Sequence, residues 1–321
     1  MQGRSAAYAV GRVRVLEGTL IGRAQLERLA GCGSIGELAR SLGELNWGEA
    51  KTRQDIDNLC AAHMREACAT VRECSSDEAL TDCFLIGYDA LNLKALYKMK
   101  ALGGTVATSE LGILNAEKLR RAVDENDYRE LPPEFKGAME EIEKQASVKL
   151  DPLFVDSEID KAMYRYIARR ISGTSEKVVR QYFTCKVELI NLTIALRAHA
   201  MGRGGQFAGA LFVEGGTIPL DKVQRVADEP ERAWDLIRLR PYADQLAPSV
   251  KALDVGAIER ATDDYLLGLL RPHRYEPTSV LPLIGYLLAR SREAMAVRLL
   301  AAAKTTGVKS ERIMERLRAL Y

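Results

Sequence analysis

The sequence predicts an all-α protein built from three similar helical units. Apolar residues recur at helical spacing along most of the 321 residues, no run of alternating β-branched residues predicts a strand, and aromatic residues make up only 6% of the chain. In addition, the stretch 89–103 (DALNLKALYKMKALG) returns in pattern at 188–202 (ELINLTIALRAHAMG) and at 293–307 (EAMAVRLLAAAKTTG). Three helices of one pattern indicate one structural unit used three times.

Each copy of this repeated helix begins with an acid and ends with a basic last turn and a glycine. An asparagine follows the acid by three residues in two copies, and Ala296 takes that place in the third. The pattern is typical of an amphipathic helix that ends in a left-handed C-cap. We expect its polar positions to form a structural seam in each domain. They are Asp89, Asn92 and Lys100; Glu188, Asn191 and His199; and Glu293, Arg298 and Lys304.

A second repeated segment supports the division into three units. Residues 117–125 (EKLRRAVDE) resemble residues 221–229 (DKVQRVADE), and residues 24–30 (AQLERLA) form a weaker copy. The separation between this segment and the following repeated helix is similar in all copies. This order predicts helical domains at 1–105, 106–205 and 206–321.

The other helices are predicted from apolar spacing and from breakers. Ser75 followed by Glu78 indicates a capping box that starts the first repeated helix. Asp151–Pro152 is expected to separate two helices. The predicted helices cover 8–30 with a weak point near Gly18 or Gly22, a short segment through Leu38 and Leu42, a longer one through 56–71, and 134–149, 156–171 and 310–320.

The charge balance gives no general reason to expect a nucleic-acid partner, because 46 Lys and Arg residues nearly match 44 Asp and Glu residues. No apolar run reaches the roughly 20 residues of a membrane span, and the first residues lack the apolar core of a signal peptide. We therefore expect a soluble, cytosolic protein. Its six cysteines are expected to be reduced thiols.

Metal and nucleotide sites are not favoured. Cys60, His63 and Cys68 lack the ligand spacing of a zinc site and are interpreted as helix residues. Residues 31–36 satisfy GxGxxG but follow a helical segment where the dinucleotide fingerprint requires a strand. We expect no cofactor.

Catalytic groups are also scarce. Asp263-Asp264 resembles an aspartate-rich magnesium motif, but Tyr265-Leu266-Leu267 follows where a further carboxylate is needed. We interpret the pair as a solvated helix start. The three histidines stand beside no plausible nucleophile.

Two basic clusters have two possible interpretations. They are solvated helix faces or docking patches for an acidic partner. Their residues are Arg165, Arg169 and Arg170, and Arg238 and Arg240.

Four motifs together resemble one known family. They are residues 8–17 (YAVGRVRVLE), Asp89-x-x-Asn92-Leu93-Lys94-x-Leu96, residues 282–290 (PLIGYLLAR) leading into Glu293, and the C-terminal residues 315–321 (ERLRALY). With these motifs the chain resembles, over essentially its whole length, the C subunit of archaeal and bacterial A/V-type ATPases, which corresponds to the d subunit of eukaryotic V-ATPases. Residues 296–298 (AVR) depart from the family's Asn-Leu-Arg pattern. We expect a polar contact to be lost in the third domain.

The resemblance implies a funnel-shaped protein of three domains around a pseudo-threefold axis. Such a protein has no active site and no cofactor. It carries torque in proton or sodium transport, with the central shaft and the membrane rotor ring as partners. It is a monomer in isolation and is held peripherally at the cytoplasmic face of the membrane through these partners. The alternatives are a cytosolic helical-repeat scaffold for another protein and an all-α magnesium enzyme that uses Asp263-Asp264.

Overall fold

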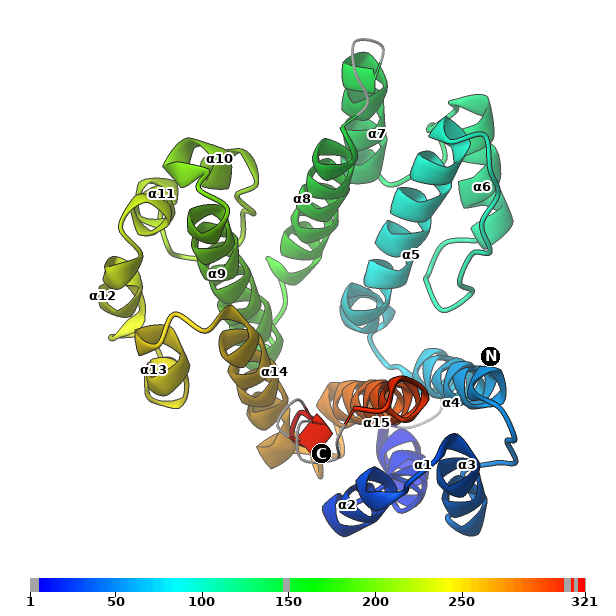
Figure 1. Ribbon diagram of the computed structural model, residues 1–321. Coiled ribbons are helices and arrows are strands. Elements are labelled where there is room, and N and C mark those ends of the chain that lie inside the picture. The colour runs from blue at the N-terminus through cyan, green and yellow to red at the C-terminus, as the bar shows by residue number, and fades with distance from the viewer. Residues whose placement is uncertain (1–5, 147–150, 309–312, 315–316, 321) are drawn as a thin grey trace. The chain divides into compact units, whose positions relative to one another are not determined.

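All of the regular structure that the computed structural model describes is helical (Figure 1). The structure describes residues 6–146, 151–308, 313–314 and 317–320, and no strand occurs among them. The all-α fold class is therefore confirmed. Within the same residues, no helix combines the length and the apolar character needed to cross a membrane.

The first of two compact units combines the two ends of the chain, Met1–Thr81 and Leu267–Tyr321. Its longest helix, α15, packs along α4 (Figure 1). Thr52 starts α4 with a capping box, because its hydroxyl accepts from the N–H of Asp55 and the Asp55 carboxylate accepts from the N–H of Thr52. The helices of this unit are α1 (Ala6–Glu17), α2 (Arg23–Gly31), α3 (Ile35–Glu44), α4 (Arg53–Cys74), the short 3-10 helix η2 (Arg271–His273) and α15 (Leu281–Thr306).

The second unit covers Asp82–Leu266. Long helices α5, α8 and α9 traverse it, with α8 between α5 and α9 (Figure 1). Helices α5 and α14 each begin in one unit and end in the other. The elements are α5 (Glu78–Ala101), α6 (Ala116–Glu125), α7 (Pro133–Ala146), α8 (Pro152–Ile171), α9 (Lys177–Ala200), α10 (Gly204–Ala210), α11 (Leu220–Asp228), η1 (Pro230–Arg232), α12 (Ala233–Ile237), α13 (Ala243–Lys251) and α14 (Val255–Leu270).

An aromatic cluster joins α5 to α9 within the second unit. The ring of Phe84 on α5 lies 5.1 Å from that of Tyr182 and 4.9 Å from that of Phe183. Tyr182 and Phe183 themselves meet edge to face at 5.2 Å. Aromatic pairs at these distances stabilise a contact by about 0.5–1.5 kcal/mol beyond the area that they bury. The cluster fixes one end of α9 against the start of α5.

The observed helix boundaries correct several predictions. Asp77 caps α5 by accepting from the N–H of Leu80 at 3.1 Å, whereas Ser75 accepts from the N–H of Asp77, so the capping box predicted at Ser75 was wrong. The helix predicted at 8–30 is divided into α1 and α2 at Gly18–Gly22. The cap of α5 differs because short polar side chains compete for the same free N–H groups at a helix start. The break between α1 and α2 falls at the weak point that the sequence predicted near Gly18 or Gly22.

Two other boundaries bear on the predictions for α8 and for the C-terminus. Helix α8 begins four residues before the predicted start, because Asp151 caps it and Pro152 occupies its first position. Proline suits that position, where its missing N–H is not needed. Within the predicted C-terminal helix 310–320, residues 310–312 and 315–316 lie outside the described residues, residues 313–314 are helical, and residues 317–320 are not helical.

Candidate functional site

Each repeated helix holds another segment of the chain through its acid and its basic residue, and two of the three helices also use an amide. We call such a set a clamp. The first clamp consists of Asp89, Asn92 and Lys100 of α5, the second of Glu188, Asn191 and His199 of α9, and the third of Glu293 and Lys304 of α15, with Ala296 at the amide position.

The first clamp holds the segment that leads into α6. Asp89 is fully buried, and its Oδ2 accepts a hydrogen bond from the backbone N–H of Ile113 at 2.7 Å. Asn92 Nδ2 donates to the carbonyl oxygen of Ser109, and the N–H of Ser109 donates to Asn92 Oδ1, both at 2.8 Å. Because one amide satisfies both backbone groups of one residue, it fixes the direction of the segment as well as its position.

The second clamp repeats this geometry on the segment that leads into α11. Glu188 Oε1 accepts from the N–H of Thr217 at 3.0 Å and from its hydroxyl at 2.6 Å. Asn191 Nδ2 donates to the carbonyl oxygen of Val213 at 2.8 Å, and the N–H of Val213 donates to Asn191 Oδ1 at 2.9 Å. Both clamp side chains are buried. A buried carboxylate needs such donors, since burial without them is costly.

Two further side chains, those of Tyr242 and Arg240, interact with the buried carboxylate of Glu188. The hydroxyl of Tyr242 donates to Oε2 at 2.7 Å, and Arg240 Nη1 lies 3.4 Å from Oε1. Burial raises the pKa of Tyr242 well above its ordinary value, and its hydrogen bond to Glu188 raises it further. The phenol therefore stays neutral and serves as a donor. Arg240 belongs to a basic cluster with two interpretations, a solvated helix face or a docking patch, and its guanidinium reaches this buried carboxylate.

The third clamp is built differently because alanine occupies the amide position. Glu293 Oε1 still accepts from a backbone N–H, that of Ile21 at 2.7 Å. Arg290, one turn before the acid and 3% exposed, pairs with Glu293 Oε2 and donates to the hydroxyl of Thr19 at 2.8 Å. Burial disfavours the charge of Arg290, but its interactions with Glu293 and Tyr286 together outweigh this effect and raise the pKa of Arg290. Arg290 thus reaches the clamped segment where Ala296 makes no polar contact.

The basic residue of each clamp contacts a backbone carbonyl oxygen on the helix that follows the clamped segment. Such a contact satisfies a carbonyl at the C-terminal end of a helix, where the helix dipole favours a cation. Lys100 Nζ lies 2.5 Å from Val123 O on α6, His199 Nδ1 lies 3.1 Å from Ala227 O on α11, and Lys304 Nζ lies 2.6 Å from Ala30 O on α2.

Glycine permits the close approach of the clamped backbone in two copies. A Cβ atom on Gly112 would lie 1.9 Å from Asp89 Oδ1, and one on Gly216 would lie 2.9 Å from Glu188 Cγ. Each glycine immediately precedes the residue whose N–H the acid accepts. A side chain at either position would push the carboxylate out of place.

The clamps connect the predicted domains in cyclic order. Helix α5 lies in the first predicted domain and holds a segment of the second, and α9 of the second holds a segment of the third. Helix α15 of the third holds the start of the first. The division at 105/106 and 205/206 stays a prediction.

The remaining predicted residues lie outside the clamps. Arg298 is exposed, with its Nε 3.8 Å from Asp57. Arg165 is half-buried on α8. The other arginines of the basic clusters have acidic neighbours: Arg169 with Glu134 at 2.8 Å, Arg170 with Asp82 at 3.6 Å and Arg238 with Asp235 at 3.5 Å.

The residues that the sequence analysis considered and rejected for metal, nucleotide or catalytic sites occupy structural positions. Cys60 Sγ lies 3.6 Å from Ala294 O, and His63 Nε2 lies 2.7 Å from Trp47 O. Residues 31–36 connect α2 to α3, with Ser34 as the N-cap of α3. Asp263 and Asp264 lie half-buried inside α14, so their assignment to a helix start was wrong.

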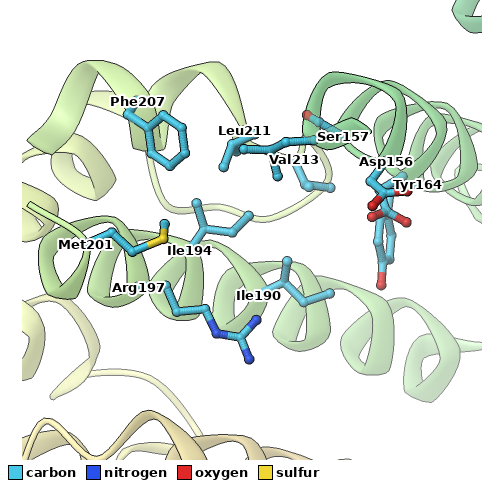
Figure 2. A pocket seen from close by; sticks show the side chains of 12 residues that line it. Asp156, Ser157, Tyr164, Ile190, Ile194, Arg197, Met201, Phe207, Leu211 and Val213 are labelled. Carbon is cyan, nitrogen blue, oxygen red and sulfur yellow. The ribbon is translucent and has the colours of Figure 1, made fainter. Parts of the chain in front are cut away.

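A cavity of about 410 Å³ lies beside the second clamp helix (Figure 2). Its floor is formed by α9, one wall by α8, and the other by α10 and the segment after it. The guanidinium of Arg197 points away from the labelled apolar side chains and pairs with Glu259 at 2.6 Å. The lining residues are Leu153, Asp156, Ser157, Asp160, Tyr164, Ile190, Ile194, Arg197, Met201, Phe207, Leu211 and Val213.

Comparison with known proteins gives similarities over most of the chain. The A-type ATP synthase C subunit of Halorubrum lacusprofundi is 25% identical, with 97% of this chain and 96% of that protein covered. The corresponding protein of Methanosarcina acetivorans is 23% identical, with 97% and 92% covered. The V-type sodium ATPase C subunit of Enterococcus hirae is 21% identical over 78% of each chain.

A family model gives the decisive match. The model described as ATP synthase (C/AC39) subunit matches residues 9–316 and so includes all three clamps. The family expected from the sequence motifs is confirmed: the chain belongs to the ATP synthase (C/AC39) subunit family.

Proposed function

We propose that this chain is a non-catalytic central-stalk component of a rotary A/V-type ATPase. It links the soluble rotor shaft to the membrane rotor ring and carries torque between them, coupling ATP turnover to proton or sodium transport. The observation that carries the proposal is the family match over residues 9–316. The names of the relatives, which are C subunits of A-type ATP synthases and of a V-type sodium ATPase, support it.

The clamps supply the stiffness that such a coupler needs. A helix carries torque to a neighbouring segment only if the contact between them does not slip. Buried carboxylate and amide contacts to backbone groups resist slipping, since breaking them leaves buried polar groups without partners. We assign Asp89, Glu188 and Glu293 a structural role in three domains around a pseudo-threefold axis.

The proposal includes the position of the protein in the assembly. The chain is a monomer in isolation, and its protein partners hold it at the cytoplasmic face of the membrane. The arginines of the basic clusters are proposed contacts for acidic partner surfaces, with the exposed Arg169 and Arg238 best placed for this role. We also propose that the chain needs no cofactor.

Reconstitution with the shaft and ring proteins of the same organism tests the proposal. We expect the purified chain to hydrolyse no ATP, to elute as a monomer, and to bind a shaft subcomplex and a detergent-solubilised ring. A shaft subcomplex from which this chain is omitted is the matched control, and it should not be retained on the ring. Absence of binding to both partners would overturn the proposal.

A further inference from the structure

A small pocket lies between α11 and the segment 230–240, which contains η1 and α12 (Figure 1). Its volume is about 230 Å³, and every residue that lines it belongs to the second unit. Pockets that take a whole drug-sized ligand usually have about 300–1,000 Å³. This pocket is therefore suited to one small chemical group rather than to a nucleoside.

The pocket is lined mainly by cationic side chains. Lys222 and Arg225 come from α11, Arg232 from η1 and Arg240 from the segment after α12. Asp235 of α12 is the one carboxylate among the lining residues. Four cations against one carboxylate leave a surplus of positive charge, and such a surplus in a concave site attracts an anion.

Three of these cations extend from the surface and stay available to a ligand. Arg225 lies 3.6 Å from Asp221 and Arg232 pairs with Glu229, but both pairs are solvent-exposed. Exposed ion pairs contribute little to stability, so a more highly charged anion can replace the acid. Lys222 is exposed and forms no ion pair in the part of the chain that the structure describes.

The fourth cation, Arg240, is held in place by the protein itself. Its Nη1 donates to Thr217 Oγ1 at 2.5 Å and lies 3.4 Å from Oε1 of the buried Glu188 carboxylate. A guanidinium has five N–H donors, and those on Nε and Nη2 of Arg240 have no hydrogen-bond partner among the described residues. A fixed arginine with free donors suits a phosphate, because the planar fork contacts two phosphate oxygens at once.

The start of α11 adds a further attraction for an anion. Pro219 lines the pocket and is the N-cap of this nine-residue helix, so the N-cap supplies no side-chain acceptor for the free N–H groups of the first turn. The positive end of a helix dipole favours negative charge. The buried side chains of Ile218 and Val226 also line the pocket. Apolar lining reduces the screening by water and strengthens the attraction.

We propose that this pocket binds a phosphate monoester group. At neutral pH a monoester carries a charge of about −1.5 to −2, which matches the positive surplus better than the single charge of a diester or a carboxylate. The group belongs either to a small soluble molecule or to the headgroup of an anionic lipid, since both present the same oxygen atoms. The assignment does not depend on the proposed function, because the isolated chain contains the whole pocket.

Two binding experiments on the purified full chain distinguish the two sources. Calorimetric titration with glycerol 3-phosphate tests a soluble ligand, and the diester dimethyl phosphate is the control. Co-sedimentation with phosphatidylcholine vesicles that contain phosphatidic acid tests a lipid headgroup, with phosphatidylglycerol in its place as the diester control. Binding in the titration identifies a soluble ligand, and binding to the vesicles alone identifies a lipid. In either case we expect the diester to bind about tenfold more weakly, since it carries one charge fewer.

Two substitutions with opposite expected effects test the lining residues. Lys222→Gln should weaken monoester binding about threefold, because it removes a cation, and Asp235→Asn should strengthen it about threefold, because it removes the carboxylate. Lys177→Gln is the matched control, since Lys177 is an exposed lysine of α9 outside the pocket, and its affinity should stay at the wild-type value. Each variant is first shown by circular dichroism to unfold at the wild-type midpoint.

Three results would overturn the assignment. The first is the absence of monoester binding in both experiments. The second is equal affinity for the monoester and the diester. The third is an equal effect of Lys222→Gln and Lys177→Gln, which would show that the ligand responds to the net charge of the chain and not to this pocket.

Discussion

The side chain of Asn191 pairs with both backbone groups of a single residue, Val213, through two hydrogen bonds of 2.8 and 2.9 Å. Asn92 holds Ser109 in the same way. Asparagine is suited to this task because its amide offers a donor and an acceptor in one plane. The contact is buried in the second clamp, so water cannot replace either partner there.

Replacement of the Asn191 amide should therefore lower the stability of the fold. Asn191→Ala leaves a buried N–H and a buried carbonyl of Val213 without partners, at about 1–3 kcal/mol each, and we expect the free energy of unfolding to fall by about 2–4 kcal/mol. Urea unfolding followed by circular dichroism measures it. The control is Asn58→Ala on an exposed position of α4, with a change within about 0.5 kcal/mol. Equal effects of the two substitutions would contradict a structural role for the clamp amide.

The close approach of the backbone at the first clamp gives a second prediction. Gly112→Ala places a Cβ 1.9 Å from Asp89 Oδ1, so the carboxylate must move and lose its hydrogen bond to Ile113. We expect a loss of about 1–3 kcal/mol in the free energy of unfolding. Gly137→Ala is the matched control, because Gly137 lies inside α7 with open space around it. There alanine should stabilise by about 0.5–1 kcal/mol. Thermal melts compare the two variants. If Gly112→Ala raised the melting temperature as Gly137→Ala does, the clash between the new Cβ and Asp89 would be relieved at little cost, and the prediction would be wrong.

The sequence predicts the repeated helices but not what they hold. The acid, amide and basic positions could be aligned because they recur at fixed helical spacing. The partners that all three clamps share are backbone groups, which leave no residue-type signal, and Glu293 reaches Ile21, far away in the sequence. Only the folded chain shows that the third clamp closes on the N-terminal segment.

Arg290 is the clamp residue that the sequence analysis missed. The departure at Ala296 predicted a lost polar contact, and no polar side chain stands at that position. The structure adds an arginine one turn before the acid, reaching Thr19 on the clamped segment. A signal was present, since Arg290 ends the otherwise uncharged run 282–289. Its partner could not be identified because burial of an arginine depends on tertiary packing.

Loss of Arg290 should affect stability more than loss of an exposed arginine on the same helix. Arg290→Met leaves the buried Glu293 carboxylate without its cation, and we expect destabilisation by about 3–5 kcal/mol. Arg298→Met serves as the control, because its ion pair with Asp57 is partly exposed and long, at 3.8 Å. Its effect should stay within about 0.5 kcal/mol. A double-mutant cycle with Thr19→Val measures the coupling free energy between Arg290 and Thr19. A coupling of zero would contradict a stabilising hydrogen bond from Arg290 to the clamped segment.

Because cysteine thiols are buried in the fold, we expect the free energy of unfolding to fall at alkaline pH. Burial raises the pKa of Cys60 from about 9 to about 12. Below pH 9 this thiol is protonated in both the folded and the unfolded chain, so its contribution to stability is fully present. As the pH rises from 9 toward 12, the unfolded chain loses the proton before the folded chain does, and the free energy of unfolding falls. One such group lowers it by up to about 1.4 kcal/mol per pH unit.

Cys60→Ala removes this contribution, so its stability should fall less steeply than that of the wild type between pH 9 and 11. Urea unfolding at a series of pH values under reducing conditions measures the slope. Cys32→Ala is the control for the loss of one thiol, since Cys32 is half-exposed while Cys60 is fully buried. Cys60→Ala also leaves a small cavity, but a cavity lowers the whole curve and leaves its slope unchanged. A Cys60→Ala curve parallel to the wild type would therefore show that this thiol ionises equally easily in the folded and unfolded chains.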